Sequence, residues 1–434
     1  MAKFLINVFS VIITSLYFFP IEFIFLPGIN TKMVLAGIGL LILGKQLASK
    51  GNAHMDKSFF VLSLFALSIS LVSLATMTIN NTPDGSFLTY FVSIWVWMGG
   101  AYTVIKWLNY AYGYVNVQLV CNSLIAVCVM QCIIAIIKDF YPPLQSWVDS
   151  IIGGEAFMGN TKEARLSGIG AALDVAGLRF SAVTIMIGYL LFNVKNMDTR
   201  QLLLYIVSLF IIAVIGNMIS RTTTVGIALV LLYWLYLYCF QFNVNNKSVW
   251  AWFLGILCVI IPVFIYLYNT NENFYENIRF GFEGFFSLWE TGSWQTGSND
   301  ILLNHMVVFP DNWKTWLIGD GYAANPVDPR YTDPYYTGPV YHGYYMGTDI
   351  GYLRFIFYFG IIGAFLFIIF IGKVAYECML RFKEYRVMFL MILLVNYLVW
   401  FKVSSDIFPV FALFLVLNNE LEDEKKNNMH MEVC

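Results

Sequence analysis

Charge is what this sequence has least of. Only 12% of its 434 residues are Asp, Glu, Lys or Arg, and 59% are apolar, whereas a soluble domain carries ~25% charged and ~45–50% apolar residues. So little charge cannot coat a soluble particle of this size. The formal net charge of −2 also provides no basic surplus to neutralise phosphates, which excludes nucleic-acid binding by charge.

The sequence is equally poor in the motifs of soluble enzymes and disulfide scaffolds. Its seven cysteines lie in apolar runs or beside charged tails rather than in the long polar segments, so no disulfide framework is expected. There are four histidines and neither an H-E-x-x-H nor a C-x-x-C motif, so we predict no metal site. The G-x-S-x-G and P-loop motifs are also missing, and we expect no cofactor.

What the sequence has in abundance is apolar blocks of about 15 to 24 residues, the length of bilayer-spanning helices. We predict an all-α polytopic membrane protein with about twelve transmembrane helices. The second and last blocks are short for a bilayer crossing. The predicted spans are 4–26, 32–48, 58–79, 87–108, 115–137, 175–194, 201–219, 222–240, 250–268, 350–372, 386–401 and 405–417.

Lysine and arginine concentrate in alternate connections between these blocks, which sets the orientation of the chain. Both termini are predicted to be cytoplasmic, and the two large polar segments, 138–174 and 269–349, to face outward. The first block is too long for the apolar core of a cleaved signal peptide and is expected to stay as a helix. We treat 1–434 as one membrane domain with a solvated cytoplasmic tail at 418–434.

Arginines at the predicted outer interface are the most informative residues. Outward arginines oppose the usual distribution of positive charge, so an anion is expected to meet them. A guanidinium can form two parallel hydrogen bonds to phosphate and keeps its charge. The alternative is that each arginine reaches lipid headgroups or pairs with a local carboxylate. The arginines in question are Arg165, Arg179, Arg221, Arg279 and Arg354.

The 269–349 segment combines acidic and aromatic residues. It holds ten carboxylates against three cations, which argues against an anionic glycan lying directly over it. Its last third is rich in tyrosine, and Tyr341, Tyr344 and Tyr345 are candidate sugar-binding residues because their rings can stack on sugars while their hydroxyls form hydrogen bonds. The alternative is a proline-stiffened lid or an interfacial aromatic belt.

Two residues near the end of this segment are candidates for acid–base chemistry. His342 is the only histidine close in sequence to the tenth span, and it serves either as a general base or as a locally bonded loop residue. Asp349 is a second candidate base, although either it or Thr348 would also suit the N-cap of the following helix.

Three segments resemble bacterial O-antigen polymerases and the related O-antigen ligases. Leu317-Ile-Gly-Asp-Gly-Tyr322, upstream of Thr348–Gly363, resembles the polymerases, as does the layout of spans with a long late outward loop. The turn Ser220–Thr224 resembles the ligases. The spacing of an arginine and a glycine found in some members is not reproduced, since Gly177 stands twelve residues after Arg165.

The resemblance implies an enzyme of the bacterial inner membrane with a periplasmic active site and a fold similar to all-helical lipid-dependent glycosyltransferases. Such an enzyme moves a glycan from one undecaprenyl diphosphate to a new lipid-linked repeat unit. The family's outward arginines would correspond to Arg165 and Arg221, with Arg279 and Arg354 as further diphosphate-binding candidates. His342 matches by position a histidine on which the ligases rely.

Chemistry of this kind needs no nucleotide or metal, because arginines can stabilise the diphosphate leaving group. The base that takes the acceptor proton would be His342, Asp349 or Glu163. The implied partners are the undecaprenyl-diphosphate-linked oligosaccharide, membrane lipids and a polysaccharide chain-length regulator. The alternatives are a ligase that passes the glycan to lipid A core, and a flippase or secondary transporter, which would place its charges nearer the bilayer midplane.

Overall fold

The computed structural model describes residues 2–50, 57–153, 165–194, 197–240, 247–327, 333, 336–339 and 343–417. Within these ranges the secondary structure is helical apart from one two-residue strand pair. Eight helices are long and apolar enough to cross a membrane, the architecture of a multi-pass helical membrane protein. They are α3 (Lys57–Asn80), α4 (Tyr90–Tyr112), α5 (Val117–Phe140), α8 (Leu173–Asn193), α9 (Thr199–Ile219), α10 (Thr223–Phe240), α11 (Lys247–Thr270) and α16 (Gly351–Arg381).

Helices also form at the other four predicted span positions, but they do not meet the same test of length and hydropathy. The number twelve is therefore not confirmed. These helices are α1 (Ala2–Phe18), α2 (Thr31–Lys50), α17 (Arg386–Val399) and Phe408–Leu417.

The first predicted span, 4–26, is wrong at its C-terminal end. Helix α1 ends at Phe18, because Pro20 disfavours helical geometry at the residue before it and has no N–H to donate. The chain then forms strand β1 (Glu22–Phe23), which pairs antiparallel with β2 (Ile152–Gly153). Because apolar residues continue past Pro20, the predicted span extends beyond the end of helix α1.

The chain folds as two compact units, where the sequence suggested one domain. The first comprises 1–35, 102–294 and 390–395, and the second comprises 36–101, 295–389 and 396–434. The boundaries fall inside helices such as α4 and α17, so no polar linker marks them in the sequence. The predicted loop 269–349 is also divided, at residue 294.

In the first unit, α8 is buried along nearly its whole length and packs against α5, α9 and α10. Helix α8 approaches α10 closely at Gly226, where a Cβ would lie only 2.5 Å from the backbone of Ser181. Arg179 is buried in α8 and donates to the carbonyl of Phe18, the last residue of α1. A cation at this position satisfies a carbonyl at the helix end and complements the helix dipole, so Arg179 holds α1 in place.

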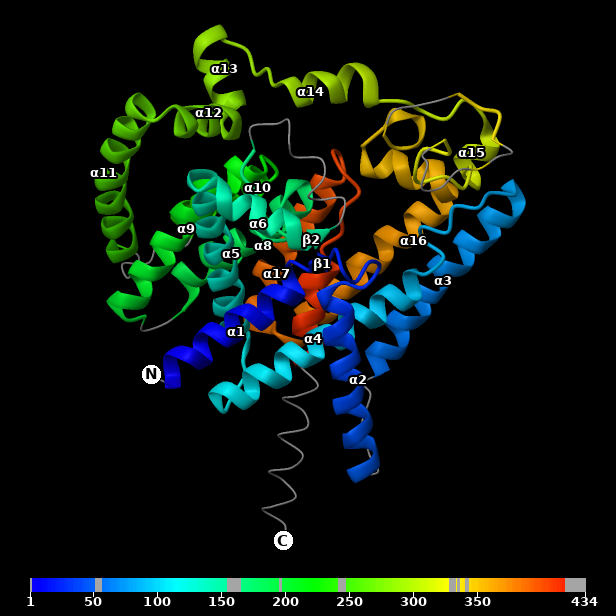
Figure 1. Ribbon diagram of the computed structural model, residues 1–434, viewed down its shortest axis with the longest axis horizontal. Helices are drawn as coiled ribbons and strands as arrows, with labels where there is room; N and C mark the ends of the chain where they lie inside the picture. The colour runs from blue at the N-terminus through cyan, green and yellow to red at the C-terminus, as the bar shows by residue number, and fades with distance from the viewer. Residues whose placement is uncertain are drawn as a thin grey trace. The chain divides into compact units, whose positions relative to one another are not determined.

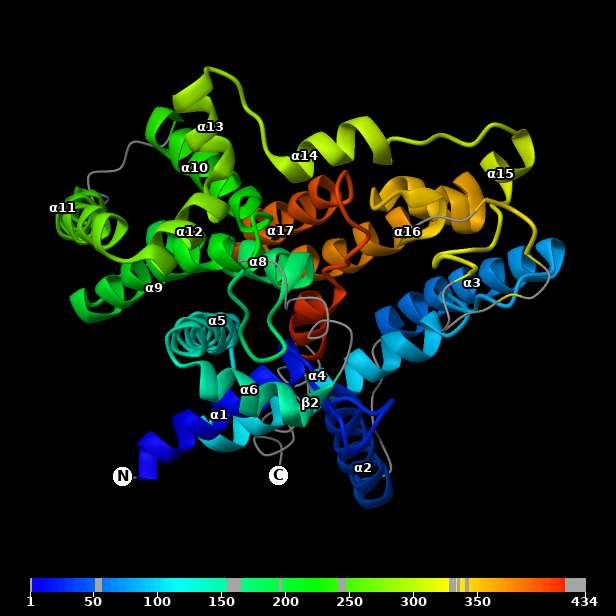
Figure 2. The same ribbon diagram turned by 45° about the horizontal axis from the view of Figure 1, so that its top comes forward.

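Three helices continue this unit beyond α10. The long helix α11 has few buried residues and is followed by α12 (Glu272–Gly281) and α13 (Glu283–Thr291). Figures 1 and 2 show them as an arc in which α11 and α12 lie beside α9. A short helix, α6 (Pro142–Ile151), links α5 to β2.

In the second unit, α16 lies beside α3 (Figure 1) and is broken at Phe359 and Gly360, where the backbone leaves helical geometry. The break frees the carbonyl oxygens of Phe357 and Tyr358, which accept hydrogen bonds from the N–H groups of Asp320 (2.6 Å) and Gly321 (3.0 Å). The two segments that carry the resemblance to the polymerases, Leu317–Tyr322 and Thr348–Gly363, are therefore packed against each other.

The part of 269–349 that belongs to the second unit has short local structure, in keeping with its prolines. Apolar residues of this part, including Leu302 and Val308, pack against Leu353 and Phe357 in the first turns of α16. The short elements are α14 (Gly297–Ile301), a π-helical turn (Leu302–Met306), α15 (Trp313–Leu317) and a 3₁₀ turn (Tyr345–Gly347).

Candidate functional site

Arg221 lies in the turn between α9 and α10, and polar contacts with α8 fix that turn. The hydroxyls of Ser220 and Thr222, on either side of it, both donate to Asp174 in the first turn of α8. The Ser181 hydroxyl donates to the Thr222 carbonyl at 2.9 Å. Because its neighbours are anchored in this way, the arginine projects from a rigid base rather than from a loose loop.

Arg165 begins the described segment that leads into α8. This segment is held against α5, whose Gln131 accepts a hydrogen bond from the N–H of Ile169 at 2.8 Å. Lys138, buried in the last turn of α5, donates to the Ser167 hydroxyl at 3.1 Å and to the Gly168 carbonyl at 3.4 Å. The segment is therefore as firmly placed as the Arg221 turn.

Phe280 of α12 brings these two arginines together. The guanidinium carbon of Arg221 lies 4.6 Å from the centre of its ring, and that of Arg165 lies 4.8 Å from the same point. Both distances are in the range of cation–π attraction. Two cations on one ring repel each other, which favours the presence of an anion nearby. The sequence placed both arginines in one site, and the structure brings them together.

Glutamates of α13 pair with two of the arginines. Arg221 forms an ion pair with Glu283, and Arg279 binds Glu290 through both of its terminal nitrogens, one of them at 3.0 Å. The hydrogen bonds from Arg279 lower the pKa of the Glu290 carboxyl, and the same bonds raise the pKa of Arg279. Local pairing with carboxylates, the alternative that the sequence left open, therefore occurs at both arginines.

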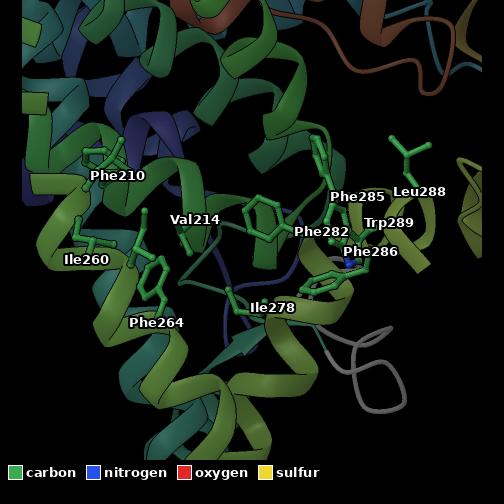
Figure 3. A pocket seen from close by; sticks show the side chains of 12 residues that line it. Phe210, Val214, Ile260, Phe264, Ile278, Phe282, Phe285, Phe286, Leu288 and Trp289 are labelled. Carbon is green, nitrogen blue, oxygen red and sulfur yellow. The ribbon is translucent and has the colours of Figure 1, made fainter. Parts of the chain in front are cut away.

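An open apolar cavity of about 840 Å³ is formed by side chains of this part of the chain (Figure 3). Arg279 stacks at 4.6 Å on Phe286, one of the lining residues. The volume is in the range of small-molecule sites, and a cavity lined almost wholly by apolar atoms suits a hydrocarbon. Its walls come from α9, α11, α12 and α13, as Phe210, Val214, Leu257, Ile260, Ile261, Phe264, Ile278, Phe282, Phe285, Phe286, Leu288 and Trp289.

The second unit holds Arg354, in the first turn of α16. Its guanidinium carbon lies 3.4 Å from the centre of the Tyr344 ring, and its Nη1 donates to the Ser404 hydroxyl at 2.6 Å. The Asp349 carboxylate is 3.9 Å away. Arg354 is thus gathered with Asp349 and Tyr344, while the other four arginines that the sequence singled out belong to the first unit.

The two described candidate tyrosines differ in surroundings. Tyr344 is half exposed, and Arg354 covers one face of its ring. A sugar would have to stack on the opposite face or displace the arginine. Tyr345 points inward, where its hydroxyl donates to Asp320 at 3.2 Å and its ring packs on Tyr322. Burial, followed by the hydrogen bond to Asp333, raises the pKa of Tyr322.

Of the three candidate bases, Asp349 alone lies in the described residues. It does not cap α16: the helix begins after Ile350 without a side-chain cap, and Thr348 accepts from the Ile350 N–H at 3.3 Å while donating to Met306. Asp349 instead lies beside Arg354, whose Nη1 is 3.9 Å from its carboxylate. His342, Glu163 and the candidate sugar-binding residue Tyr341 lie outside the described residues.

Several residues of these arrangements were not anticipated from the sequence. Phe280 and Glu283 stand far from Arg221 in the chain, and no local pattern links them to it. Asp84, buried in the turn Thr82-Pro-Asp-Gly85, accepts from the N–H groups of Ala323 (2.8 Å) and Ala324 (3.1 Å). The Thr82-Pro-Asp-Gly85 sequence is typical of a turn, but nothing in it indicates the contact with Ala323 and Ala324.

In the part of the chain that the structure describes, no three His, Cys, Asp or Glu residues gather closely enough to hold a metal ion. No family model, no curated protein and no solved structure matches the chain. The resemblance to the polymerases therefore depends on the motifs and on the layout of the spans.

Proposed function

We propose that this protein is an O-antigen polymerase: a metal-independent glycosyltransferase that joins undecaprenyl-diphosphate-linked oligosaccharide repeat units on the periplasmic side of the inner membrane. One observation carries the proposal more than any other. Two arginines share the Phe280 ring of α12, and Ile278 and Phe282 of the same helix line an apolar cavity. A lipid diphosphate likewise combines a charged head with a hydrocarbon chain.

The diphosphate would bind between Arg165 and Arg221. Both guanidiniums are charged at every physiological pH and can form paired hydrogen bonds to phosphate oxygens. Their placement on rigid segments favours stabilisation of charge that develops on the leaving group, because fixed donors need no reorganisation during the reaction. The isoprenoid chain would then occupy the cavity between α9, α11, α12 and α13.

In the reaction, an acceptor hydroxyl oxygen attacks the anomeric carbon of the donor glycan. A new C–O bond forms, the bond from that carbon to the diphosphate oxygen breaks, and the diphosphate leaves with the electron pair. The proton of the hydroxyl passes to a base, for which Asp349, His342 and Glu163 are the candidates. Tyr344, Tyr345 and Tyr341 would contact the sugars, and Arg354 would bind phosphate or orient Asp349.

The proposal includes cytoplasmic termini, outward placement of 269–349, and cooperation with a chain-length regulator. The Lys and Arg distribution supports the orientation. The chain-length regulator is proposed because such a partner is expected for the family that the motifs resemble.

Deletion of the gene in its own bacterium tests the class of function. A polymerase loss leaves export and ligation intact, so the lipid A core should be capped by one repeat unit, visible as a single band above bare core on a gel. Loss of a ligase would leave polymer on the lipid carrier and bare core. Loss of a flippase would trap single units on the cytoplasmic leaflet, and either of these two results would reject the proposal.

A further inference from the structure

Asp139 is a carboxylate that the sequence did not single out. It is the next-to-last residue of α5, and its side chain is partly buried. One of its oxygens, Oδ2, accepts a hydrogen bond from the Nδ2 of Asn277 in α12 at 3.3 Å. The side chain forms no hydrogen bond or ion pair with any other residue that the structure describes. The second oxygen, Oδ1, therefore keeps its lone pairs for a ligand.

The bond to Asn277 places Asp139 close to the paired arginines. Asn277 is buried and stands three residues before Phe280 on α12, so the two side chains are neighbours on one side of that helix, with Cβ atoms about 5–6 Å apart. The Phe280 ring in turn contacts Arg165 and Arg221. The partner of Asp139 is thus one helical turn from the residue that brings the arginines together.

A second contact, independent of α12, gives the same placement. Lys138, the neighbour of Asp139 in the last turn of α5, donates to the Ser167 hydroxyl at 3.1 Å. Ser167 stands two residues after Arg165. The end of α5 is therefore joined both to the segment that carries Arg165 and to the helix that carries Phe280.

A base for the proposed reaction must lie close to the bound diphosphate. The anomeric carbon that the acceptor hydroxyl attacks is bonded directly to a diphosphate oxygen, so the hydroxyl loses its proton next to the phosphate. If Arg165 and Arg221 hold the diphosphate, the base must come from the groups around them. Asp139 belongs to the same unit as these arginines, whereas Asp349 belongs to the other unit.

Three other described carboxylates in this part of the chain are less suited to accept a proton. Glu283 and Glu290 are paired with arginines, and Asp174 accepts hydrogen bonds from two hydroxyls. Pairing with a cation and several hydrogen bonds both favour the charged form of a carboxyl group and weaken it as a base. Asp139 has one neutral partner, which holds the carboxylate in place and leaves its second oxygen for a proton.

We propose that Asp139 is the catalytic base of the transfer. Its Oδ1 takes the proton of the acceptor hydroxyl while the hydroxyl oxygen forms the new bond to the anomeric carbon. The bond from that carbon to the diphosphate oxygen breaks, the diphosphate leaves with the electron pair, and the carboxyl group later gives its proton to water. This inference rests on the proposed function and names the group that accepts the proton in it.

The test measures the rate at which the purified full-length protein joins lipid-linked repeat units extracted from the deletion strain. Asp139→Asn keeps the hydrogen bond with Asn277, because its amide oxygen can still accept that bond, but it cannot take the proton. General-base catalysis contributes roughly 100- to 10,000-fold to a rate, so kcat should fall by a factor in this range. KM should change little, because the interaction lost is one made in the transition state.

Asn277→Ala is the reverse variant, since it removes the hydrogen bond and keeps the carboxylate. Its kcat should fall much less than that of Asp139→Asn, whereas the two would fall alike if Asp139 merely attached α12 to α5. Asp139→Glu keeps a carboxylate and should recover part of the rate. Glu276→Gln, at the exposed neighbour of Asn277 on α12, is the control and should keep wild-type rates.

Asp139→Ala adds a readout that a structural role would not change. It leaves room for a small carboxylate, so added formate should raise its rate but should not raise that of Asp139→Asn. Melting temperatures show whether each variant is folded. Should Asp139→Asn lose its fold, this rescue decides, and a rate that formate does not raise then overturns the inference.

The outcomes separate the two proposals. If wild type joins repeat units and folded Asp139→Asn keeps the wild-type kcat, or if Asn277→Ala loses as much kcat as Asp139→Asn, the base is another residue and the inference is overturned while the polymerase proposal stands. If folded wild type joins no repeat units, the polymerase proposal fails and the inference fails with it.

Discussion

Replacement of Arg221 tests the diphosphate site most directly. Arg221 is mostly buried, with a side chain 16% exposed, and it contacts both Glu283 and Phe280. Loss of a charge-assisted hydrogen bond to a bound anion costs ~1.5–3 kcal/mol. If that bond tightens in the transition state, Arg221→Ala should reduce the rate of polymer formation roughly 10- to 150-fold.

The same change should cost the fold much less. The ion pair with Glu283 is partly solvated, and pairs of this kind contribute ~0.2–1 kcal/mol. The cation–π contact adds about 0.5–1 kcal/mol. The hydroxyls of Ser220 and Thr222 would still bind Asp174, so the turn should persist and the protein level should stay close to normal.

The assay compares polymer ladders on a gel with the amount of protein in the membrane. Arg221→Lys keeps the charge but loses the planar fork and should recover part of the activity. Arg200→Ala, at the exposed start of the same helix α9, is the control and should make polymer of normal length and amount. Normal polymer from Arg221→Ala at normal protein level would refute the reasoning, and so would a loss that merely follows a lower protein level.

Three other predictions follow from the packing, the charges and the orientation. Gly319→Ala puts a Cβ 2.4 Å from the Tyr358 carbonyl oxygen. The control is Gly343→Ala, because Gly343 shares the positive φ but has open space around it. In thermal unfolding in detergent, Gly319→Ala should destabilise the protein by ~1–3 kcal/mol more than this control. Pairing with Arg279 lowers the pKa of Glu290 from its usual value near 4.5. The pairing therefore stabilises the folded state above that pH, and this stability is lost as the pH falls through the lowered pKa. On acidification the melting temperature of the wild type should fall further than that of Glu290→Gln. Reporter fusions at Gly347 and at the C-terminus should give periplasmic and cytoplasmic signals respectively, and a periplasmic signal at the C-terminus would contradict the predicted orientation.

Helix positions were largely predictable because an apolar run of sufficient length has few alternatives in a membrane. The predicted spans 201–219 and 222–240 differ from α9 and α10 by two residues at most. The first span failed because hydropathy does not register the effect of Pro20 on backbone geometry. The end of α16 was also missed, since the helix continues nine residues past the predicted limit of 372 into more polar sequence.

The site was predictable only in its local part. The arginines stand out one at a time, because positive charge at the outer ends of spans is unusual. Their partners do not, because Glu283 lies 62 residues from Arg221 and its pairing depends on how α12 and α13 return to the α9–α10 turn. Likewise, Leu317–Tyr322 stood out in the sequence only through the family resemblance, and the sequence did not show that its N–H groups satisfy carbonyls freed by the break in α16.

The geometry of α13 also divides the roles of the arginines that the sequence grouped together. Glu283 and Glu290 are about 10 Å apart along the helix axis, a separation far greater than that of two adjacent phosphates. One diphosphate therefore cannot replace both glutamates while α13 stays in place. Arg165 and Arg221, joined by Phe280, are suited to hold the head of the ligand. Arg279, bound by both nitrogens to Glu290 and stacked on Phe286, is suited to keep α13 against the cavity while the head binds.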